Sequence, residues 1–321
     1  MRRFLVSVAI GSLALAGSAA AMLAPGRTIV APSPVSSLSV TYRSVVYAVT
    51  ENASRTRCAY LELWDTATRG LWRFGESTTR VCREGPSTGS GISDVATSGR
   101  RVYWLTYVGG NIREYALWTA TPSRRSPRLL AEGASDVDAG IPAVVLGDGT
   151  REGVAYAVGR SVTYIADSGA RLFRVELNDR VRLVAAGIGP GRARVVAALG
   201  DGRVVTLSAD GRVLGTLPAG AAVVALGLAL PGAIVQRSRD VTVGGDTVTL
   251  PAAAVMRDYR QGRVVYASGR QVRSRRVSTG ADALLQVVAV RPGQRPLFST
   301  DAWGSAWATG ASVSWRAGPL P

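Results

Sequence analysis

A short apolar segment of one kind recurs along the chain, and it has the composition of a β-strand. Each copy holds three to five residues rich in Val, Ile, Tyr and Thr, and Gly, Asp or Arg stand around it. β-Branched and aromatic residues favour strands, and segments of this length between turn residues are typical of them. The sequence therefore predicts strands at residues 45–49, 102–106, 154–158, 204–207, 234–236 and 264–267.

The residues after each copy repeat as well. A longer segment with alternating apolar and polar residues comes next, followed by a polar turn and a short apolar segment. Alternation with a period of two is the pattern of a strand. Each unit is therefore predicted to be a meander of an inner strand, the Val-Tyr strand, a longer third strand and a short outer strand. Glu62 and Glu176 occupy similar places in third strands, and we expect both to face solvent.

The spacing of the units predicts the fold class. They begin about 30 to 57 residues apart, around the length of a four-stranded propeller blade. No stretch after the first residues has a convincing amphipathic helical period, and Gly220 and Gly227 oppose a helix in the apolar stretch 219–230. We predict an all-β fold, a β-propeller of six or seven (about seven) four-stranded antiparallel blades.

With this repeat, the chain resembles the broad class of secreted bacterial β-propellers, such as the TolB-like, quinoprotein-like and WD40-like proteins. The resemblance covers nearly all of the chain after its first residues, but its motif is generic. Trp64-Asp65 is the one Trp-Asp dipeptide, whereas a family signature would recur in every blade. Residues 299–304 approach the Asp-box of sialidase-type propellers, with Gly304 one residue late.

Partition of the chain by this repeat predicts seven units and a closed ring. The fourth and fifth units are short, so they have three strands or their limits are misplaced. The last unit lacks an outer strand, which residues 28–30 could supply. Such closure removes a sheet edge and predicts that the two chain ends lie close together. The predicted units are residues 35–85, 90–132, 135–186, 190–218, 221–251, 253–288 and 289–321.

The first residues have the order of a signal peptide. Arg2 and Arg3 precede an apolar run, and small residues follow at 18–21. We expect residues 1–21 to be a signal peptide, 22–34 an N-terminal segment with a candidate closing strand, and 35–321 one propeller domain. The alternative is an uncleaved anchor, because residues 4–24 are long enough to span a bilayer. The predicted location is secreted, extracellular or in the cell envelope.

Cys58 and Cys82 are the only cysteines. In an oxidising compartment such a pair is typical of one disulfide, and here it would join the third strand of the first unit to the segment after its outer strand. Two free buried thiols are the alternative.

The charge pattern excludes most catalytic groups. The chain carries a formal net charge of +16, with 38 basic residues, no His and no Lys. Without His there is no Ser-His or Cys-His couple, and without Lys no P-loop. We therefore predict no catalytic residues, no metal site and no cofactor. Asp136, Asp138 and Asp148 could supply oxygens to Ca²⁺, but a role as turn residues is favoured because the EF-hand spacing is missing.

The candidate binding residues are arginines and tryptophans. Arg257, Arg260, Arg273, Arg275 and Arg276 cluster around the sixth unit, where they could hold an anionic polymer or an acidic partner. The alternatives are an ordinary solvated strand and an arginine excess from genomic composition. Trp303 and Trp307 could stack on sugar rings, although packing between blades is the usual role of such residues.

Three functions remain open at this stage. The first is a monomeric binding scaffold for a protein or an anionic cell-envelope polymer, with nucleic acid excluded as a partner and no membrane span after signal cleavage. The second is a propeller enzyme that processes glycans, a hydrolase or lyase, with carboxylates and arginines lining a central channel. The third is a purely structural role. Converging acids and arginines at the centre would favour the enzyme, and a basic or aromatic rim without them would favour the scaffold.

Overall fold

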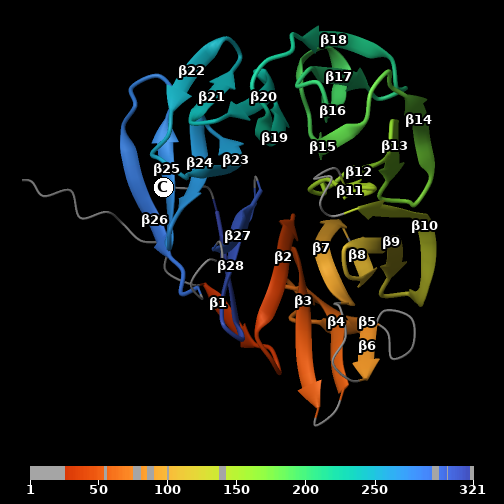
Figure 1. Ribbon diagram of the computed structural model, residues 1–321. Coiled ribbons are helices and arrows are strands. Elements are labelled where there is room, and N and C mark those ends of the chain that lie inside the picture. The colour runs from red at the N-terminus through yellow and green to blue at the C-terminus, as the bar shows by residue number, and fades with distance from the viewer. Residues whose placement is uncertain are drawn as a thin grey trace, which may run out of the picture.

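The computed structural model describes residues 26–53, 56–74, 81–84, 90–99, 101–136, 142–290, 296–301 and 303–318. The predicted signal peptide, residues 1–21, lies outside these ranges. Over the described residues, twenty-nine strands form seven antiparallel sheets arranged in a ring, so the predicted fold class is confirmed (Figure 1). One 3-10 turn, Pro190–Arg192, interrupts the β-structure. Over the described residues, no helix is long and apolar enough to cross a bilayer.

Each blade has an inner strand at the ring centre and a second strand that carries the repeated apolar motif. The inner strands are β2 (Val35–Thr41), β7 (Ser90–Ser98), β11 (Val144–Leu146), β15 (Val181–Ala186), β19 (Val223–Ala229), β23 (Val255–Arg260) and β27 (Leu297–Thr300). The second strands are β3 (Ser44–Ala53), β8 (Arg101–Gly109), β12 (Gly153–Val158), β16 (Ala193–Leu199), β20 (Gly232–Arg237), β24 (Arg263–Ser268) and β28 (Gly304–Thr309).

The third and outer strands complete each blade. The third strands are β4 (Thr56–Asp65), β9 (Ile112–Thr121), β13 (Ser161–Ala166), β17 (Val204–Ser208), β21 (Asp240–Val243), β25 (Gln271–Arg276) and β29 (Ser312–Ala317). The outer strands are β5 (Leu71–Phe74), β10 (Arg124–Asp136), β14 (Arg171–Glu176), β18 (Val213–Leu217), β22 (Asp246–Thr249), β26 (Asp282–Val287) and β1 (Arg27–Val30). In the first blade β6 (Val81–Glu84) also pairs with β4.

The predicted ring closure is confirmed. β1 pairs with β29 from Arg27 opposite Trp315 to Val30 opposite Ser312, so the start of the described chain completes the last blade. The Gly26 amide donates to the Trp315 carbonyl at 3.0 Å, which brings the first and last described segments together. The closing strand covers an edge of β29 that would otherwise present unpaired backbone groups.

The prediction for the third and fourth units is wrong in one respect. The sequence predicts that the third unit extends to residue 186, with its outer strand at 181–184, but β15 pairs with β16 and opens the fourth blade. The strand that this partition missed is β13, and β14 is the outer strand of the third blade. The fourth and fifth blades therefore have four strands each. Both faces of a blade are covered, so an apolar segment does not reveal which blade it joins.

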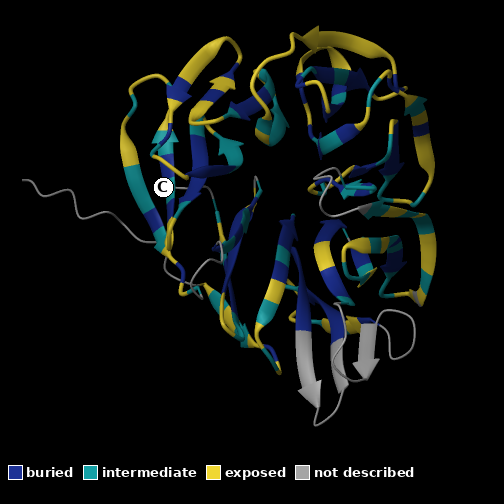
Figure 2. Cartoon of the chain, viewed as in Figure 1, coloured by how far each residue is buried: buried dark blue, intermediate teal, exposed yellow. Residues whose placement is uncertain are grey.

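The core lies in the seams between neighbouring blades. One cluster joins Tyr164 and Phe173 of the third blade to Val195 and Leu207 of the fourth, and similar clusters fill the other seams. Buried positions run through the blades, whereas exposed positions concentrate on outer strands and turns (Figure 2). The seams hold the ring together, and the ring brings inner strands of distant blades close to one axis.

Candidate functional site

The predicted basic cluster divides between two places in the sixth blade. Arg257 and Arg260 lie on the inner strand β23, whereas Arg273, Arg275 and Arg276 lie on the third strand β25. Arg273 forms an ion pair with Asp282 at 3.2 Å. The five side chains therefore do not form one continuous patch.

The two predicted tryptophans also have different surroundings. Trp307 is 4% exposed and packs with Val265 and Phe298 between the sixth and seventh blades, the packing role that the sequence also allowed. Trp303 is 48% exposed and stands in the turn between β27 and β28. Of these two tryptophans, Trp303 is the one whose indole is accessible to a ligand in solution.

Arg257 and Arg260 belong to a group of charges at the ring axis that the sequence did not reveal. We call Asp94, Asp148, Arg257, Asp258 and Arg260 the axial cluster. Asp94 comes from the second blade, Asp148 from the turn after β11 in the third, and the other three from the sixth. The sixth blade is three blades away from either of the others, so these charges influence one another across the axis.

Two carboxyls of the axial cluster share a local geometry. Asp94 and Asp258 each stand at a β-bulge of the inner strand, and each accepts the amide N–H of the next residue, at 2.9 and 2.7 Å. Bulges often redirect side chains beside functional sites. The signal in the sequence is a polar pair, Ser93-Asp94 or Arg257-Asp258, that interrupts an otherwise apolar inner strand.

The surroundings of the axial cluster raise the pKa values of its carboxyls. Asp94 and Asp148 are exposed to solvent, but the protein that surrounds them within the ring removes part of their hydration. This desolvation is the largest cause of their raised pKa values. Burial and the charge of Asp148 raise the pKa of Asp94 to about 7. Burial raises the pKa of Asp258 to about 6, against the opposing effect of Arg260, which pairs with it at 2.7 Å.

The calcium alternative gains no support from the described residues, among which no three acidic, His or Cys side chains gather as metal ligands. Asp138 lies outside the described residues, as does the side chain of Asp136. Asp148 belongs to the axial cluster instead.

A second candidate site lies at the seam where the ring closes. A groove of about 830 Å³ is lined by Arg27, Arg43, Arg316, Trp303 and Trp315, and we call these five residues the closure groove. Within the described part of the chain, none of the three arginines forms an ion pair with a carboxylate. The Arg27 guanidinium donates to the Thr66 carbonyl, which ties the closing blade to the first. The groove therefore combines uncompensated positive charge with an exposed aromatic ring.

The half-buried carboxylate of Asp301 orients the rim of this groove. It accepts the amide N–H groups of Trp303 and Gly304 at 2.8 and 3.0 Å, and also the N–H of Tyr42. The rings of Tyr42 and Trp303 meet edge to face with centroids 5.1 Å apart. Arg151 stands over the Tyr42 ring at 4.8 Å. The turn in residues 299–304 that approaches an Asp-box thus fixes the exposed indole.

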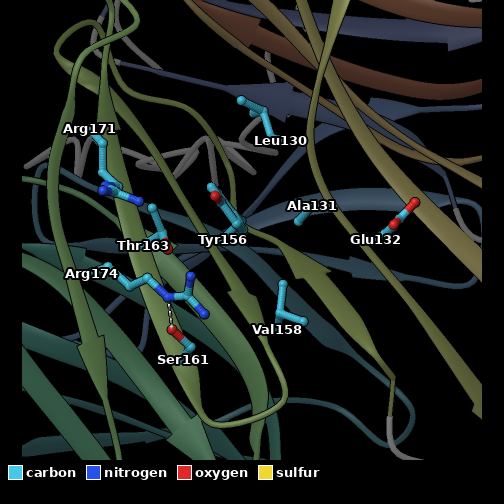
Figure 3. A pocket seen from close by; sticks show the side chains of 9 residues that line it. All are labelled: Leu130, Ala131, Glu132, Tyr156, Val158, Ser161, Thr163, Arg171 and Arg174. Atoms are coloured by element: carbon cyan, nitrogen blue, oxygen red, sulfur yellow. Dashed lines mark hydrogen bonds between the residues drawn. The ribbon is translucent and has the colours of Figure 1, made fainter.

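A smaller cleft of about 240 Å³ lies between the second and third blades (Figure 3). The outer strand β10 forms one wall and the face of the third blade forms the other. The polar residues of the third-blade wall are Tyr156, Ser161, Thr163, Arg171 and Arg174.

Glu62 is not exposed, contrary to the prediction for third strands, whereas Glu176 is exposed as predicted. Glu62 accepts the Tyr47 hydroxyl at 2.7 Å and pairs with Arg73 at 2.9 Å in the seam between the first and seventh blades. A buried carboxylate is tolerated because these donors replace its hydration.

Cys58 and Cys82 are opposite each other in the antiparallel pairing of β4 and β6. Opposite residues of antiparallel strands have the Cα separation that a disulfide requires. Their side chains lie outside the described residues, so the disulfide stays a prediction.

No family model and no curated protein matches the chain. Its structure is similar to that of Raptor from Chaetomium thermophilum, with 12% identity over 92% of this chain and a TM-score of 0.52. The chain spans 28% of the length of that protein. The Pan2 WD40 domain of Neurospora crassa matches 92% of this chain and 94% of its own length, with 11% identity and a TM-score of 0.46. At these identities the likeness concerns the fold alone. The chain thus has the fold of a seven-bladed β-propeller.

Proposed function

We propose that this protein is a binding scaffold of the cell envelope or extracellular space, and that its closure groove holds an anionic polysaccharide. The observation that carries the proposal is the convergence of Arg27, Arg43 and Arg316 with the exposed indole of Trp303 around one groove. Guanidinium groups bind carboxylates through charge-assisted hydrogen bonds, and an aromatic face offers apolar area to a sugar ring.

The proposed location rests on the signal-peptide pattern of residues 1–21. It requires the propeller to fold outside the cytoplasm, where a disulfide between Cys58 and Cys82 can form. Detection of the mature chain, beginning near residue 22, in the envelope or medium supports this location. Recovery of the full-length chain from the cytoplasm contradicts it.

The binding test uses polygalacturonate, a carboxylated sugar polymer, against neutral dextran and polyglutamate. We expect the propeller to bind polygalacturonate at low salt and to lose affinity at high salt, because exposed charges are screened. Weaker binding of polyglutamate indicates that the sugar contributes beyond its charge. Equal binding of all three polymers contradicts the proposal.

Variants then locate the site. Arg43→Gln with Arg316→Gln removes two charges from the groove, and Trp303→Ala removes the ring. We expect each change to weaken polygalacturonate binding about tenfold or more. The arginine changes remove hydrogen bonds between charged groups, which contribute roughly 1.5–3 kcal/mol. Trp303→Ala removes the apolar area that the indole offers to a sugar ring.

The matched control is Arg275→Gln with Arg276→Gln. It removes the same charge from β25, which carries three of the arginines that the sequence suggested, and should leave affinity nearly unchanged. A selective loss in this control would instead place the polymer on β25.

The axial cluster favours a second candidate function, a glycan hydrolase or lyase. Carboxyls that have raised pKa values and lie near arginines are groups that acid–base chemistry on sugars can use. The test is release of new reducing ends or unsaturated products from polygalacturonate. Turnover that Asp94→Asn abolishes while binding persists supports an enzyme, and binding without any product supports the scaffold.

A further inference from the structure

The internal repeat allows equivalent residues of different blades to be compared in the same seam position. The tyrosine of the repeated apolar motif is Tyr47 in the first blade, Tyr156 in the third and Tyr266 in the sixth. Each packs in the cluster that its blade shares with the preceding blade. The three hydroxyls are therefore in comparable environments.

In the first and sixth blades this tyrosine donates to a carboxylate that is also bound by an arginine. Tyr47 donates to Glu62 at 2.7 Å, and Arg73 contacts the same carboxylate at 2.9 Å. Tyr266 donates to Asp282 at 2.7 Å, and Arg273 contacts that carboxylate at 3.2 Å. Two blades thus use the same set of partners, a tyrosine hydroxyl, a carboxylate and a guanidinium.

The third blade keeps the tyrosine and the arginine but has a threonine in place of the acid. Thr163 is opposite both Tyr156 and Arg174, just as Glu62 is opposite both Tyr47 and Arg73. Around this ladder lies the cleft of about 240 Å³, whereas Tyr47 and Tyr266 are fully enclosed. Tyr156 is 8% exposed and Thr163 is 3% exposed, so both hydroxyls are deep in the cleft.

The polar groups of the cleft are donors that lack acceptors. Considering only the residues that the structure describes, no hydrogen bond reaches the Tyr156 or Thr163 hydroxyl, and neither Arg171 nor Arg174 pairs with a carboxylate. The Nε of Arg174 donates to Ser161 at 2.8 Å, which holds this guanidinium in the cleft (Figure 3). Tyr156 and Thr163 are buried residues, whereas Arg171 and Arg174 are exposed and reach solvent at the edge of the cleft.

The opposite wall suits a carbon chain. It comes from Leu130 and Ala131 of β10, with Val158 beside them. Glu132 stands on this side with its carboxylate turned away from the two guanidinium groups (Figure 3). The cleft is smaller than the 300–1,000 Å³ typical of sites for larger ligands, so it accommodates a short stem.

We propose that this cleft binds a carboxylate group on a short carbon stem, which accepts from the tyrosine and arginine of the third blade as Glu62 does in the first blade and Asp282 does, from the outer strand, in the sixth. Tyr156, Thr163 and Arg174 are its donors, and Arg171 adds charge at the mouth. The carboxylate belongs either to a free short-chain acid or to an acidic side chain of a partner protein. This site is separate from the closure groove.

The first experiment places the missing acid within the chain. Thr163→Glu gives the third blade the residue that the first blade has, and Thr163→Gln is its uncharged control of the same size. We expect Thr163→Glu to melt about 2–4 °C above Thr163→Gln at neutral pH, because both side chains offer an acceptor to Tyr156 but only the carboxylate forms an ion pair with Arg174. Equal melting temperatures overturn the proposal.

The second experiment adds an external acid. Propionate is titrated into the intact protein at constant ionic strength with chloride as the control anion, and the Tyr156 ring signals are followed by NMR. We expect saturation with a Kd on the order of 1 mM. Arg174→Gln should weaken binding about tenfold or more, and Thr163→Glu should abolish it.

The controls separate this site from other positive charges. Arg212→Gln removes an exposed arginine of the fourth blade that already pairs with Asp210, and it should leave propionate binding unchanged. Trp303→Ala in the closure groove should also have no effect, so failure of the polysaccharide proposal does not affect this test. Equal loss in Arg212→Gln and Arg174→Gln, or no saturation at all, overturns the proposal.

A peptide with one glutamate distinguishes the two sources of the carboxylate. Tighter binding of the peptide than of propionate, lost in Arg174→Gln, identifies an acidic side chain of a partner. Weaker binding identifies a free acid.

Discussion

Replacement of Glu62 by Ala tests whether its buried ion pair stabilises the ring. The change leaves the fully buried Tyr47 hydroxyl without an acceptor, at a cost of about 1–3 kcal/mol. The Arg73 side chain is 51% exposed and can be rehydrated, so loss of its pairing adds only about 1 kcal/mol. The lost side-chain volume adds roughly another 1 kcal/mol.

The expected total is about 3–5 kcal/mol of unfolding free energy. A domain of this size loses about 2 °C per kcal/mol, so the melting temperature should fall by roughly 6–10 °C. Differential scanning calorimetry or circular dichroism measures this shift. Glu62→Gln keeps an acceptor for the Tyr47 hydroxyl and loses only the charge, so it should cost about 1 kcal/mol.

A double-mutant cycle separates the hydroxyl from the rest of the interaction. Tyr47→Phe in the Glu62→Ala background removes the orphaned donor and should recover part of the loss. The reasoning is refuted if Glu62→Ala and Glu62→Gln have the same stability, or if Tyr47→Phe brings no recovery. Either result would mean that Tyr47 finds another acceptor and that the buried carboxylate is not what this seam depends on.

Three further predictions follow from the described residues. The pKa of Asp94 is raised to about 7, so the folded chain binds this proton more tightly than the unfolded chain, and stability falls as pH rises from about 4 to 7. Asp94→Asn should therefore melt above the wild type at pH 8 but not at pH 4. A difference in melting temperature that does not depend on pH would contradict this. Thiol titration of the unreduced protein in denaturant should detect no free thiol, and Cys58→Ser with Cys82→Ser should lose about 3 kcal/mol, because the loop of about 25 residues would no longer be closed; two titratable thiols would exclude the disulfide. A Cβ at Gly149 would collide with a backbone carbonyl oxygen of β7, so Gly149→Ala should cost about 1–3 kcal/mol, whereas Gly215→Ala, which meets no atom within 4 Å, should melt near the wild type.

The sequence by itself determined the fold class, the four-stranded repeat and the closing strand. Local composition carries this information, because β-branched residues with a period of two fit only a sheet, and a unit without an outer strand needs one from elsewhere. It also selected Trp303, which is exposed, and Trp307, which is buried, and a binding role for Trp303 stays a prediction.

Only the tertiary structure decided which blade a strand joins and which charges meet. The segment at β15 reads as a strand in either blade, and its pairing with β16 settles the matter. Glu62 is buried because the seam supplies Tyr47 and Arg73 as donors. The axial cluster forms because the ring brings inner strands from its second, third and sixth blades to one axis, a long-range contact that no local spacing in the chain records.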